Sequence, residues 1–257
     1  LNIPSNPDRT HKLDPNSLHI WPRGEYMLIA LPNLDGSFTC TLFMPFEGEN
    51  SLDQLKDIKL VEAFFAKNFP DAIDVIPKLA EDFFKNPTST LVTMKCFPWA
   101  YEDKIALIGD ACHAIVPFYG QGMNAGFEDI SILHEMMQLY GDDWKTVLSE
   151  YQKSRKPNAD AIAELSYRNF MEMSSKTADE KFLLQKKIEK WFSDKHPDLW
   201  IPLYSRVTFS DRPYAEALAI GDDQNAIMDE VLKMDNIDSK WDSVEVENKM
   251  LELLQIK

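Results

Sequence analysis

The chain has 257 residues, 44% of them hydrophobic, and a formal net charge of -15. This length and composition allow a sizeable core and argue against bulk disorder, and the acidity argues against wholesale nucleic-acid binding, which needs clustered Lys and Arg. The three separated cysteines, Cys40, Cys96 and Cys112, favour a reducing compartment, and no apolar run of about 18 residues predicts a membrane span.

The first predicted elements are strands, in residues 17–46. The segments "HIW", "YMLIALP" and "SFTCTLFMPF" are rich in β-formers, and "RG" and "NLDG" have the composition of turns. Turns this short predict antiparallel pairing. We therefore expect a three-stranded antiparallel sheet.

Two short helices and two more strands follow. Apolar residues recur at helical spacing in residues 60–65, ahead of Pro70, and again in residues 76–83. Residues 88–100 ("TSTLVTMKCFPWA") predict a strand, and residues 104–110 ("KIALIGD") predict a buried one. A lone buried strand needs neighbours in a sheet, and the chain does not obviously provide them.

From Gly122 onward the pattern is helical. One long stretch runs to about Ser174 with an interruption at Pro157, and residues 178–192 predict a further helix. Narrow apolar stripes in residues 227–234 and 246–254 predict two more helices. The fold class is therefore α/β, or α+β within these residues.

The segment "GDACHAIVPFYGQGMNAGFED" (residues 109–129) carries the chemistry. Asp110 ends a predicted strand, where its carboxylate can accept hydrogen bonds from ligand hydroxyls. Gly120 and Gly122 let the backbone approach a ligand, and the helix that starts near Met123 and Asn124 favours an anion or a ring that becomes anionic. The alternative is an ordinary capped helix after a glycine-rich loop.

Other chemistries find less support in the sequence. Gly120, Gly122 and Ala125 have dinucleotide-fingerprint spacing, but about ten residues separate them from the strand, so an ordinary Rossmann site is not predicted. Cys112 and His113 are adjacent, and neighbouring side chains diverge, which argues against a nucleophile–base pair. The five histidines show no ligand spacing, and no metal site is predicted.

The same segment resembles the second flavin motif of the class A flavoprotein aromatic hydroxylases. With "HIWPRG", "MLIALPN", "SFTCTLF" and "IPLYSRVTFS" it is similar to the branch that hydroxylates L-kynurenine, over residues 18 to about 217. The resemblance implies a para-hydroxybenzoate-hydroxylase-like FAD fold. We accordingly divide the chain into a substrate-binding sheet with covering helices (1–100), the second half of the FAD-binding domain (101–145) and a helical carboxyl-terminal region (146–257).

The resemblance also implies the reaction. Enzymes of this branch use FAD, NADPH and O2 to form 3-hydroxykynurenine through a flavin C4a-hydroperoxide, without a metal. Asp110 would bind the ribityl chain, with Gly120 and Gly122 beside it, and the helix start at Met123 and Asn124 would face the pyrimidine edge of the flavin. No residue of the chain is assigned as catalytic with certainty.

Two family features are expected to lie outside this sequence. The amino-terminal FAD fingerprint and a substrate-binding Arg and Tyr are absent, so we expect the chain to be the carboxyl-side portion of a longer protein and to need that missing part as a partner. The family also ends in a segment that attaches it to the cytosolic face of the mitochondrial outer membrane. This segment is absent too, so the chain itself is expected to be soluble.

The resemblance places substrate-contacting positions in several segments. It implies polar contacts from Asn169 and Tyr204, with Glu172 and Met173 beside them, and a flavin-side wall at Pro117 and Phe118. An aromatic pocket would be lined by Leu18, Ile29, Leu31 and Phe43.

Each of these positions has a plainer interpretation. Asn169 can be an amide satisfied by a neighbouring carbonyl, Tyr204 can be a core tyrosine, and alternating apolar residues in a strand are usually core. Two functional alternatives also remain, which are hydroxylation of another aromatic ring and a non-catalytic module that keeps the fold.

Overall fold

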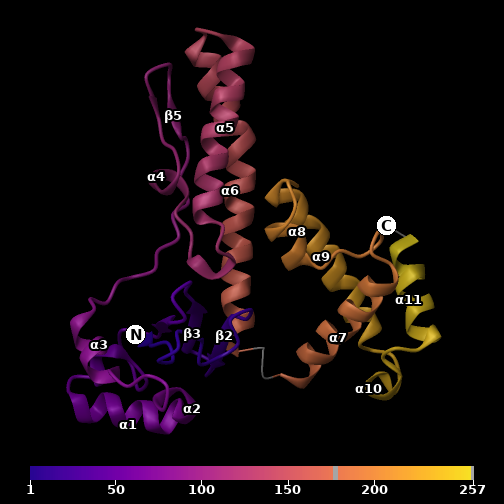
Figure 1. Cartoon of the computed structure of the whole chain (residues 1–257). Coiled ribbons are helices and arrows are strands. Elements are labelled where there is room, and N and C mark those ends of the chain that lie inside the picture. Colours follow the sequence, from indigo (N-terminus) through magenta and orange to yellow (C-terminus); the bar gives the residue numbers. More distant parts are fainter. Residues whose placement is uncertain (176–178, 256–257) are drawn as a thin grey trace. The chain divides into compact units, whose positions relative to one another are not determined.

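The computed structural model describes residues 1–175 and 179–255 (Figure 1). Contacts between residues group the chain into two units. The sheet unit consists of Leu1–Thr90 with Met171–Asp179, and the helical unit consists of Leu91–Phe170 with Glu180–Lys257. The three-part division made from the sequence stays a prediction.

The sheet unit holds a four-stranded antiparallel sheet in the order β1-β4-β3-β2. The predicted strands are confirmed as β2 (His19–Pro22), β3 (Met27–Pro32) and β4 (Phe38–Phe43). Strand β1 (Asn2–Ile3), which the sequence did not predict, pairs with β4. The β3–β4 turn is tight, because Gly36 adopts a φ of 87°.

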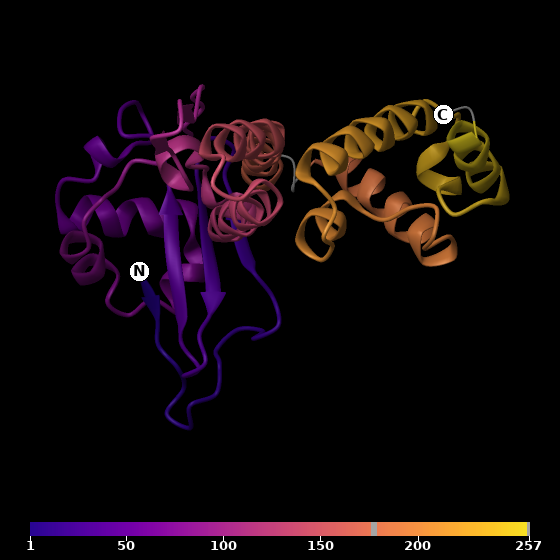
Figure 2. The same ribbon diagram turned by 90° about the horizontal axis from the view of Figure 1, so that it is seen from above.

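Short helices cover one face of this sheet (Figures 1 and 2). They are η1 (Leu52–Gln54), α1 (Ile58–Asn68), α2 (Pro70–Ile73) and α3 (Leu79–Lys85). Asp57 caps α1, because its Oδ1 accepts the Leu60 N–H at 3.0 Å. Leu28 and Ala30 of β3 pack with Val61 and Phe65 in a hydrophobic core.

Residues 88–100 do not form the predicted strand. Only β5 (Ala100–Tyr101) and β6 (Ile105–Ala106) pair in this region, and they form an antiparallel hairpin with two residues in each strand. The buried strand predicted at 104–110 is also wrong, because Ile105 is 58% exposed. Among the described residues no further strand pairs with this hairpin, so the β-rich composition has no ladder to join.

After the β5–β6 hairpin, the helical unit continues with α4 (Asp110–His113) and η2 (Pro117–Tyr119). Two long helices follow, α5 (Gly122–Tyr140) and α6 (Trp144–Ser175), which lie side by side in both ribbon views (Figures 1 and 2). The predicted interruption at Pro157 is wrong, since Pro157 lies inside α6. The chain turns instead at Gly141, whose φ of 57° suits glycine.

The rest of the helical unit confirms the helices predicted after Ser174. It contains α7 (Glu180–Lys195), α8 (Leu203–Thr208), α9 (Tyr214–Val231), α10 (Ile237–Lys240) and α11 (Val244–Gln255). Residue 178, the first of the helix predicted at 178–192, lies outside the described residues. Phe192, Trp200, Met228 and Met250 centre a core that joins α7, α9 and α11.

Within residues 1–175 and 179–255, no helix combines the length and apolar character that a bilayer crossing requires.

Candidate functional site

A hollow of about 740 Å³ lies in the helical unit where α5 begins. Three segments form it, namely the Gly109–Asp110 turn, the loop that leads to Gly120, and the first turns of α5. Its walls are mostly glycine and apolar side chains, contributed by Gly109, Asp110, Ile115, Pro117, Gly120, Gly122, Met123, Gly126, Phe127 and Ile130.

Four of the five predicted cofactor positions line this hollow, namely Asp110, Gly120, Gly122 and Met123. The fifth, Asn124, is not in its wall and donates from Nδ2 to Oε1 of Gln121 at 2.9 Å. Asp110 is exposed, and its carboxylate makes no hydrogen bond or ion pair with any residue that the structure describes. Asp110 thus lines the hollow with acceptor oxygens that have no partner among the described residues.

Glycine residues leave two sides of the hollow without side chains. Gly120 adopts a left-handed conformation (φ 67°), and a Cβ built there would meet nothing within 4 Å. Gly122 and Gly126 lie on one face of α5, where a Cβ would stand 3.7 Å from Cγ1 of Ile115 and 3.8 Å from Cα of Gly109, respectively. These are ordinary contact distances, so the protein itself leaves room for alanine at both helical positions.

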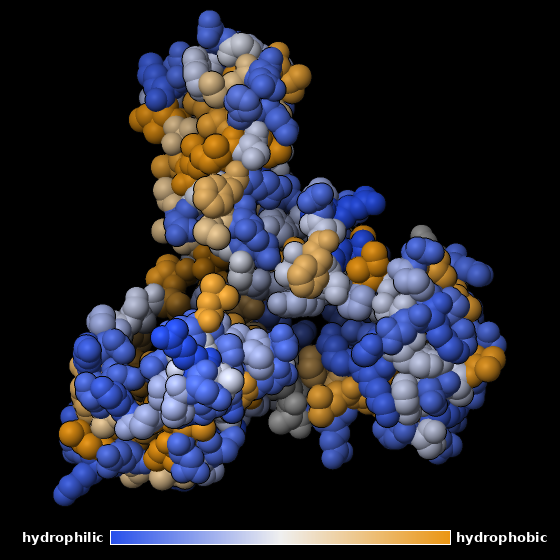
Figure 3. All heavy atoms as spheres, viewed as in Figure 1, coloured by the Kyte–Doolittle hydropathy of each residue, from blue (hydrophilic) through white to orange (hydrophobic). Residues whose placement is uncertain are grey.

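The start of α5 contributes polarity to an otherwise apolar wall. The N–H groups of its first turn have no partner within the helix, and the helix dipole places partial positive charge there. Met123, Phe127 and Ile130 are 72%, 65% and 53% exposed. Figure 3 shows apolar surface over the region of α5 and α6. The hollow can thus take a flat apolar group that bears negative charge at one edge.

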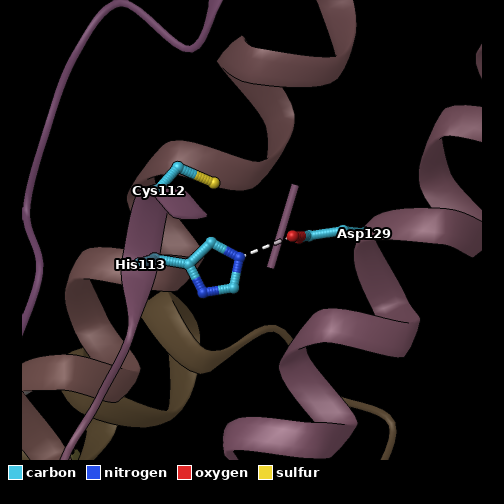
Figure 4. Close-up of side chains that lie close together, drawn as sticks. All are labelled: Cys112, His113 and Asp129. Carbon is cyan, nitrogen blue, oxygen red and sulfur yellow. Dashed lines mark hydrogen bonds and ion pairs between the residues drawn. The ribbon is translucent and has the colours of Figure 1, made fainter. Parts of the chain in front are cut away.

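A buried ionic network lies beneath the hollow. Oδ2 of Asp129 accepts hydrogen bonds from the Gly109 N–H at 2.9 Å and from Nε2 of His113 at 2.5 Å (Figure 4), and Oδ1 accepts from Nε of Arg155 at 2.7 Å. Asp129 and Arg155 are 0% and 1% exposed. Burial raises the pKa of Asp129, but the bonds from His113, Arg155 and Gly109 outweigh burial, and the pKa lies below its usual range.

Cys112, His113 and Asp129 form the one group of potential metal ligands found among the described residues, with ligand atoms within 4.8 Å of one another (Figure 4). The Cys112 thiol donates to the Gly109 carbonyl oxygen at 3.3 Å, and burial raises its pKa to about 12. Arg155 already pairs with the Asp129 carboxylate. A protonated thiol and a neighbouring guanidinium favour a hydrogen-bonded network over a cation site.

The predicted substrate positions of the helical unit lie around the η2 loop. Asn169 on α6 donates from Nδ2 to the Phe118 carbonyl oxygen at 2.7 Å, so this amide does bond a neighbouring carbonyl. The Phe118 ring packs against Phe170 with centroids 4.6 Å apart. Pro117 lines the hollow itself.

Tyr204 is not a core tyrosine. It is 51% exposed, and its ring stacks on that of Tyr119 with centroids 5.5 Å apart and an interplanar angle of 20°. The two rings join α8 to the loop that borders the hollow.

The remaining substrate positions belong to the sheet unit. Ile29, Leu31 and Phe43 lie on one face of the sheet, opposite the core residues Leu28 and Ala30, because Ile29 pairs with Thr41 and Met27 pairs with Phe43. Leu31 is 48% exposed. Their position away from the core is compatible with a lining role.

Leu18, just before β2, is 44% exposed. Glu172 and Met173 lie in the last turns of α6, in the segment grouped with the sheet, where the Gly24 N–H donates to the Ser174 carbonyl oxygen at 2.8 Å. That these residues and those of the helical unit contact one substrate stays a prediction.

The sequence did not identify the residues of the buried network. Asp129 is the last residue of the quoted motif. An acidic side chain on the inner face of a predicted helix was the signal that could have identified it as part of the network. His113 stands out in the sequence only as the neighbour of Cys112. Nothing in the sequence marks Arg155, which lies 26 residues from its partner Asp129.

Comparison with known proteins gives consistent results. Residues 68–166, which contain the whole hollow, match the family described as "FAD binding domain". The chain is 83% identical over 255 residues to a protein of Flavobacterium johnsoniae named "Kynurenine 3-monooxygenase", and the match covers 99% of this chain and 57% of that protein.

Two more relatives carry the same name. The protein of Flavobacterium psychrophilum is 75% identical over 257 residues, which is all of this chain and 58% of that protein. The protein of Dictyostelium discoideum is 48% identical over 245 residues, or 91% of this chain and 53% of that protein. The chain thus spans little more than half the length of these curated relatives.

Proposed function

The chain belongs to the kynurenine 3-monooxygenase family, and from that premise we propose that the full-length protein is an FAD-dependent, NADPH-using monooxygenase that converts L-kynurenine to 3-hydroxykynurenine. One oxygen atom of O2 enters the substrate ring. The observation that carries the proposal is the glycine-lined hollow at the start of α5, which lies within the residues that match an FAD-binding family.

The residues around the hollow fit a flavin. Its volume of about 740 Å³ suits part of such a cofactor. Asp110 offers a carboxylate with no protein partner among the described residues, which can accept hydrogen bonds from ribityl hydroxyls. The open space above Gly120 allows a planar ring to approach the backbone.

Bound FAD supplies the activation of O2 that protein side chains do not provide. The chain contributes the surroundings. The first N–H groups of α5, near Met123 and Asn124, would stabilise negative charge on a ring bound in the hollow. Pro117 lines the hollow, and together with the next residue, Phe118, it would help to keep water away from a bound ring.

Substrate contacts are proposed in each unit. In the helical unit, Asn169 and Tyr204 contact the amino-acid end of L-kynurenine, and the 51% exposure of Tyr204 supports this role. In the sheet unit, Glu172 and Met173 lie beside that end, and the aromatic ring meets a set of apolar residues, Leu18, Ile29, Leu31 and Phe43. The exposed face of β3 supports the second group.

Two further proposals rest on the resemblance alone. The three-part division puts the substrate-binding sheet at 1–100, the second half of the FAD-binding domain at 101–145 and a helical region at 146–257. Attachment of the full-length protein to the mitochondrial outer membrane also stays a prediction, which cell fractionation tests.

The proposed function is tested on the full-length protein. Purified protein should show flavin absorbance, and L-kynurenine should accelerate NADPH oxidation with formation of 3-hydroxykynurenine, measured by chromatography. Salicylate and 4-hydroxybenzoate serve as comparison substrates. Faster turnover of either one would favour another aromatic hydroxylase, and a colourless protein that binds no FAD would favour a non-catalytic module.

A further inference from the structure

We propose that Asp129 is a positioning residue, which holds the Gly109–Asp110 turn so that the Asp110 carboxylate meets the ligand in the hollow. This inference deepens the proposed function and rests on it. The proposed function leaves the buried network of Asp129, His113 and Arg155 without a role.

The Gly109 peptide is held on both sides. Its N–H donates to Oδ2 of Asp129 at 2.9 Å. Its carbonyl oxygen accepts the N–H groups of Cys112 and His113, both at 3.0 Å, and the Cys112 thiol at 3.3 Å. With φ 63° and ψ -140°, Gly109 is in a conformation that favours glycine, so a specific hydrogen bond is needed to select it.

The next residue along the chain is Asp110, which lines the hollow. Its own side chain makes no bond to the described residues, so nothing but the backbone before it and the α4 turn after it fixes its direction. The bond from Gly109 to Asp129 is therefore the link between the buried network and the ligand-facing carboxylate.

The network in turn fixes Asp129. Arg155 donates from Nε to Oδ1 at 2.7 Å, and its Nη2 reaches the Ala125 carbonyl oxygen at 3.2 Å in the first turn of α5. His113 donates from Nε2 to Oδ2 at 2.5 Å, and its ring packs on Trp99. Arg155 also pairs with Glu128 at 2.8 Å. One carboxylate thus aligns the Gly109 turn with α5, the two polar sides of the hollow.

Fold stability alone does not call for this arrangement. Buried ion pairs lose hydration on folding, and well-packed apolar residues of similar volume often stabilise a core as well or better. Apolar residues surround the network on the Trp99 side, where Tyr151 and Ala159 are also buried. The ionic contacts of Asp129 lie one residue from the hollow. Their position indicates that the network orients the Gly109–Asp110 turn rather than that it stabilises the fold.

The test measures FAD affinity of the full-length protein by fluorescence titration. Asp129→Asn keeps an acceptor for Arg155 but sets an amide N–H against the Gly109 N–H. We expect FAD to bind roughly 10- to 100-fold more weakly, the effect of one charge-assisted hydrogen bond. In that background Asp110→Ala should weaken binding by a much smaller factor than it does in the wild type.

The coupling distinguishes positioning from a loss of stability. Gly221→Ala, which perturbs the α8–α9 contact far along the chain, serves as a destabilised control, and its effect should be additive with that of Asp110→Ala. Additive effects of Asp110→Ala and Asp129→Asn, or unchanged FAD affinity in folded Asp129→Asn, would overturn the inference.

A second pair of variants decides the matter if Asp129→Asn does not fold. His113→Gln keeps a donor toward Asp129 and should retain FAD affinity, whereas His113→Leu should weaken it. Equal affinities for these two would contradict the inference. A wild-type protein that binds no FAD would contradict the proposed function itself, which keeps the two failures distinct.

Discussion

The side-chain amide of Asn169 donates a hydrogen bond to the backbone carbonyl oxygen of Phe118, with 2.7 Å between the two atoms. Phe118 belongs to the loop that borders the hollow, and Asn169 lies 51 residues later, near the end of α6. One side chain thus ties the proposed substrate region to the proposed flavin wall.

Asn169→Ala and Tyr204→Phe should weaken the use of L-kynurenine more than they lower flavin content. Each should cost roughly 1–3 kcal/mol in kcat/KM, because each removes one buried or ligand-facing hydrogen bond. Tyr204→Phe keeps the ring that stacks on Tyr119. Steady-state kinetics and flavin absorbance are the measurements.

Asn158→Ala is the control, since Asn158 is also on α6, donates to the Ser154 carbonyl oxygen and accepts the Ala215 N–H, and neither bond involves a residue of the hollow. It should leave kcat/KM unchanged. Unaltered kinetics in both Asn169→Ala and Tyr204→Phe would remove these residues from the substrate site.

Two glycines of the sheet unit should differ sharply in tolerance for alanine. Gly24 and Gly36 both have positive φ, 77° and 87°, so each alanine variant should lose about 1–2 kcal/mol to backbone strain. A Cβ on Gly24 meets nothing within 4 Å, whereas one on Gly36 would lie 2.4 Å from the Arg9 carbonyl oxygen. Gly36→Ala should therefore unfold at clearly lower urea concentration than Gly24→Ala, and equal midpoints would show that the Arg9 segment yields freely.

Asp129→Asn should reduce stability at neutral pH but not in acid. The pKa of Asp129 is lowered in the folded state, so its contribution is present above its unfolded pKa of about 3.9 and is lost as the pH falls through the folded value. The groups around it are Arg155, His113, Cys112 and Tyr151.

Loss of one partner of a buried ion pair costs roughly 3–5 kcal/mol. The difference in free energy of unfolding between wild type and Asp129→Asn should therefore be of that order at pH 7, and it should shrink below about pH 4. Urea unfolding across this range measures it. Asp103→Asn, at an exposed aspartate of the β5–β6 turn, is the control. A gap that stayed constant with pH would contradict the ionic contribution.

Gly221→Ala should destabilise the helical unit even though alanine is the better helix former. The Cβ would stand 2.7 Å and 2.9 Å from the two Cδ atoms of Leu203, where α9 crosses α8. Overpacking of this kind costs roughly 1–3 kcal/mol, which outweighs a helix-propensity gain of about 1 kcal/mol. The free energy of unfolding measures the balance, and a more stable variant would show that Leu203 rotates away at little cost.

Local patterns predicted most of the elements. The antiparallel strands were predictable because short turns dictate their pairing, and α1, α7, α9 and α11 because their apolar residues recur at helical spacing. The extended segment at 88–100 was mispredicted for a different reason. A β-rich composition forms a strand only where a partner offers hydrogen bonds, and composition does not report the partner.

Sequence separation limited what could be predicted of the site. Asp110, Gly120, Gly122 and Met123 lie within 14 consecutive positions, and the motif identified them all. The Asp129–Arg155 pair depends on how α5 packs against α6, which neither helix encodes alone. The interruption predicted at Pro157 was wrong for a related reason. Arg155 and Ala159, on either side of the proline, are buried, and their burial stabilises the helical conformation of α6 at this point.

The two glycines at the start of α5 also affect its dynamics. Each lowers helix propensity by about 1 kcal/mol relative to alanine, so the first turns of this helix should fray more readily than its middle. Amide hydrogens there should exchange with solvent faster than those around Asp129, and a flavin bound in the hollow would slow that exchange. The amino end of α5 is then a segment whose order depends on occupancy, and deuterium uptake would report binding without any turnover.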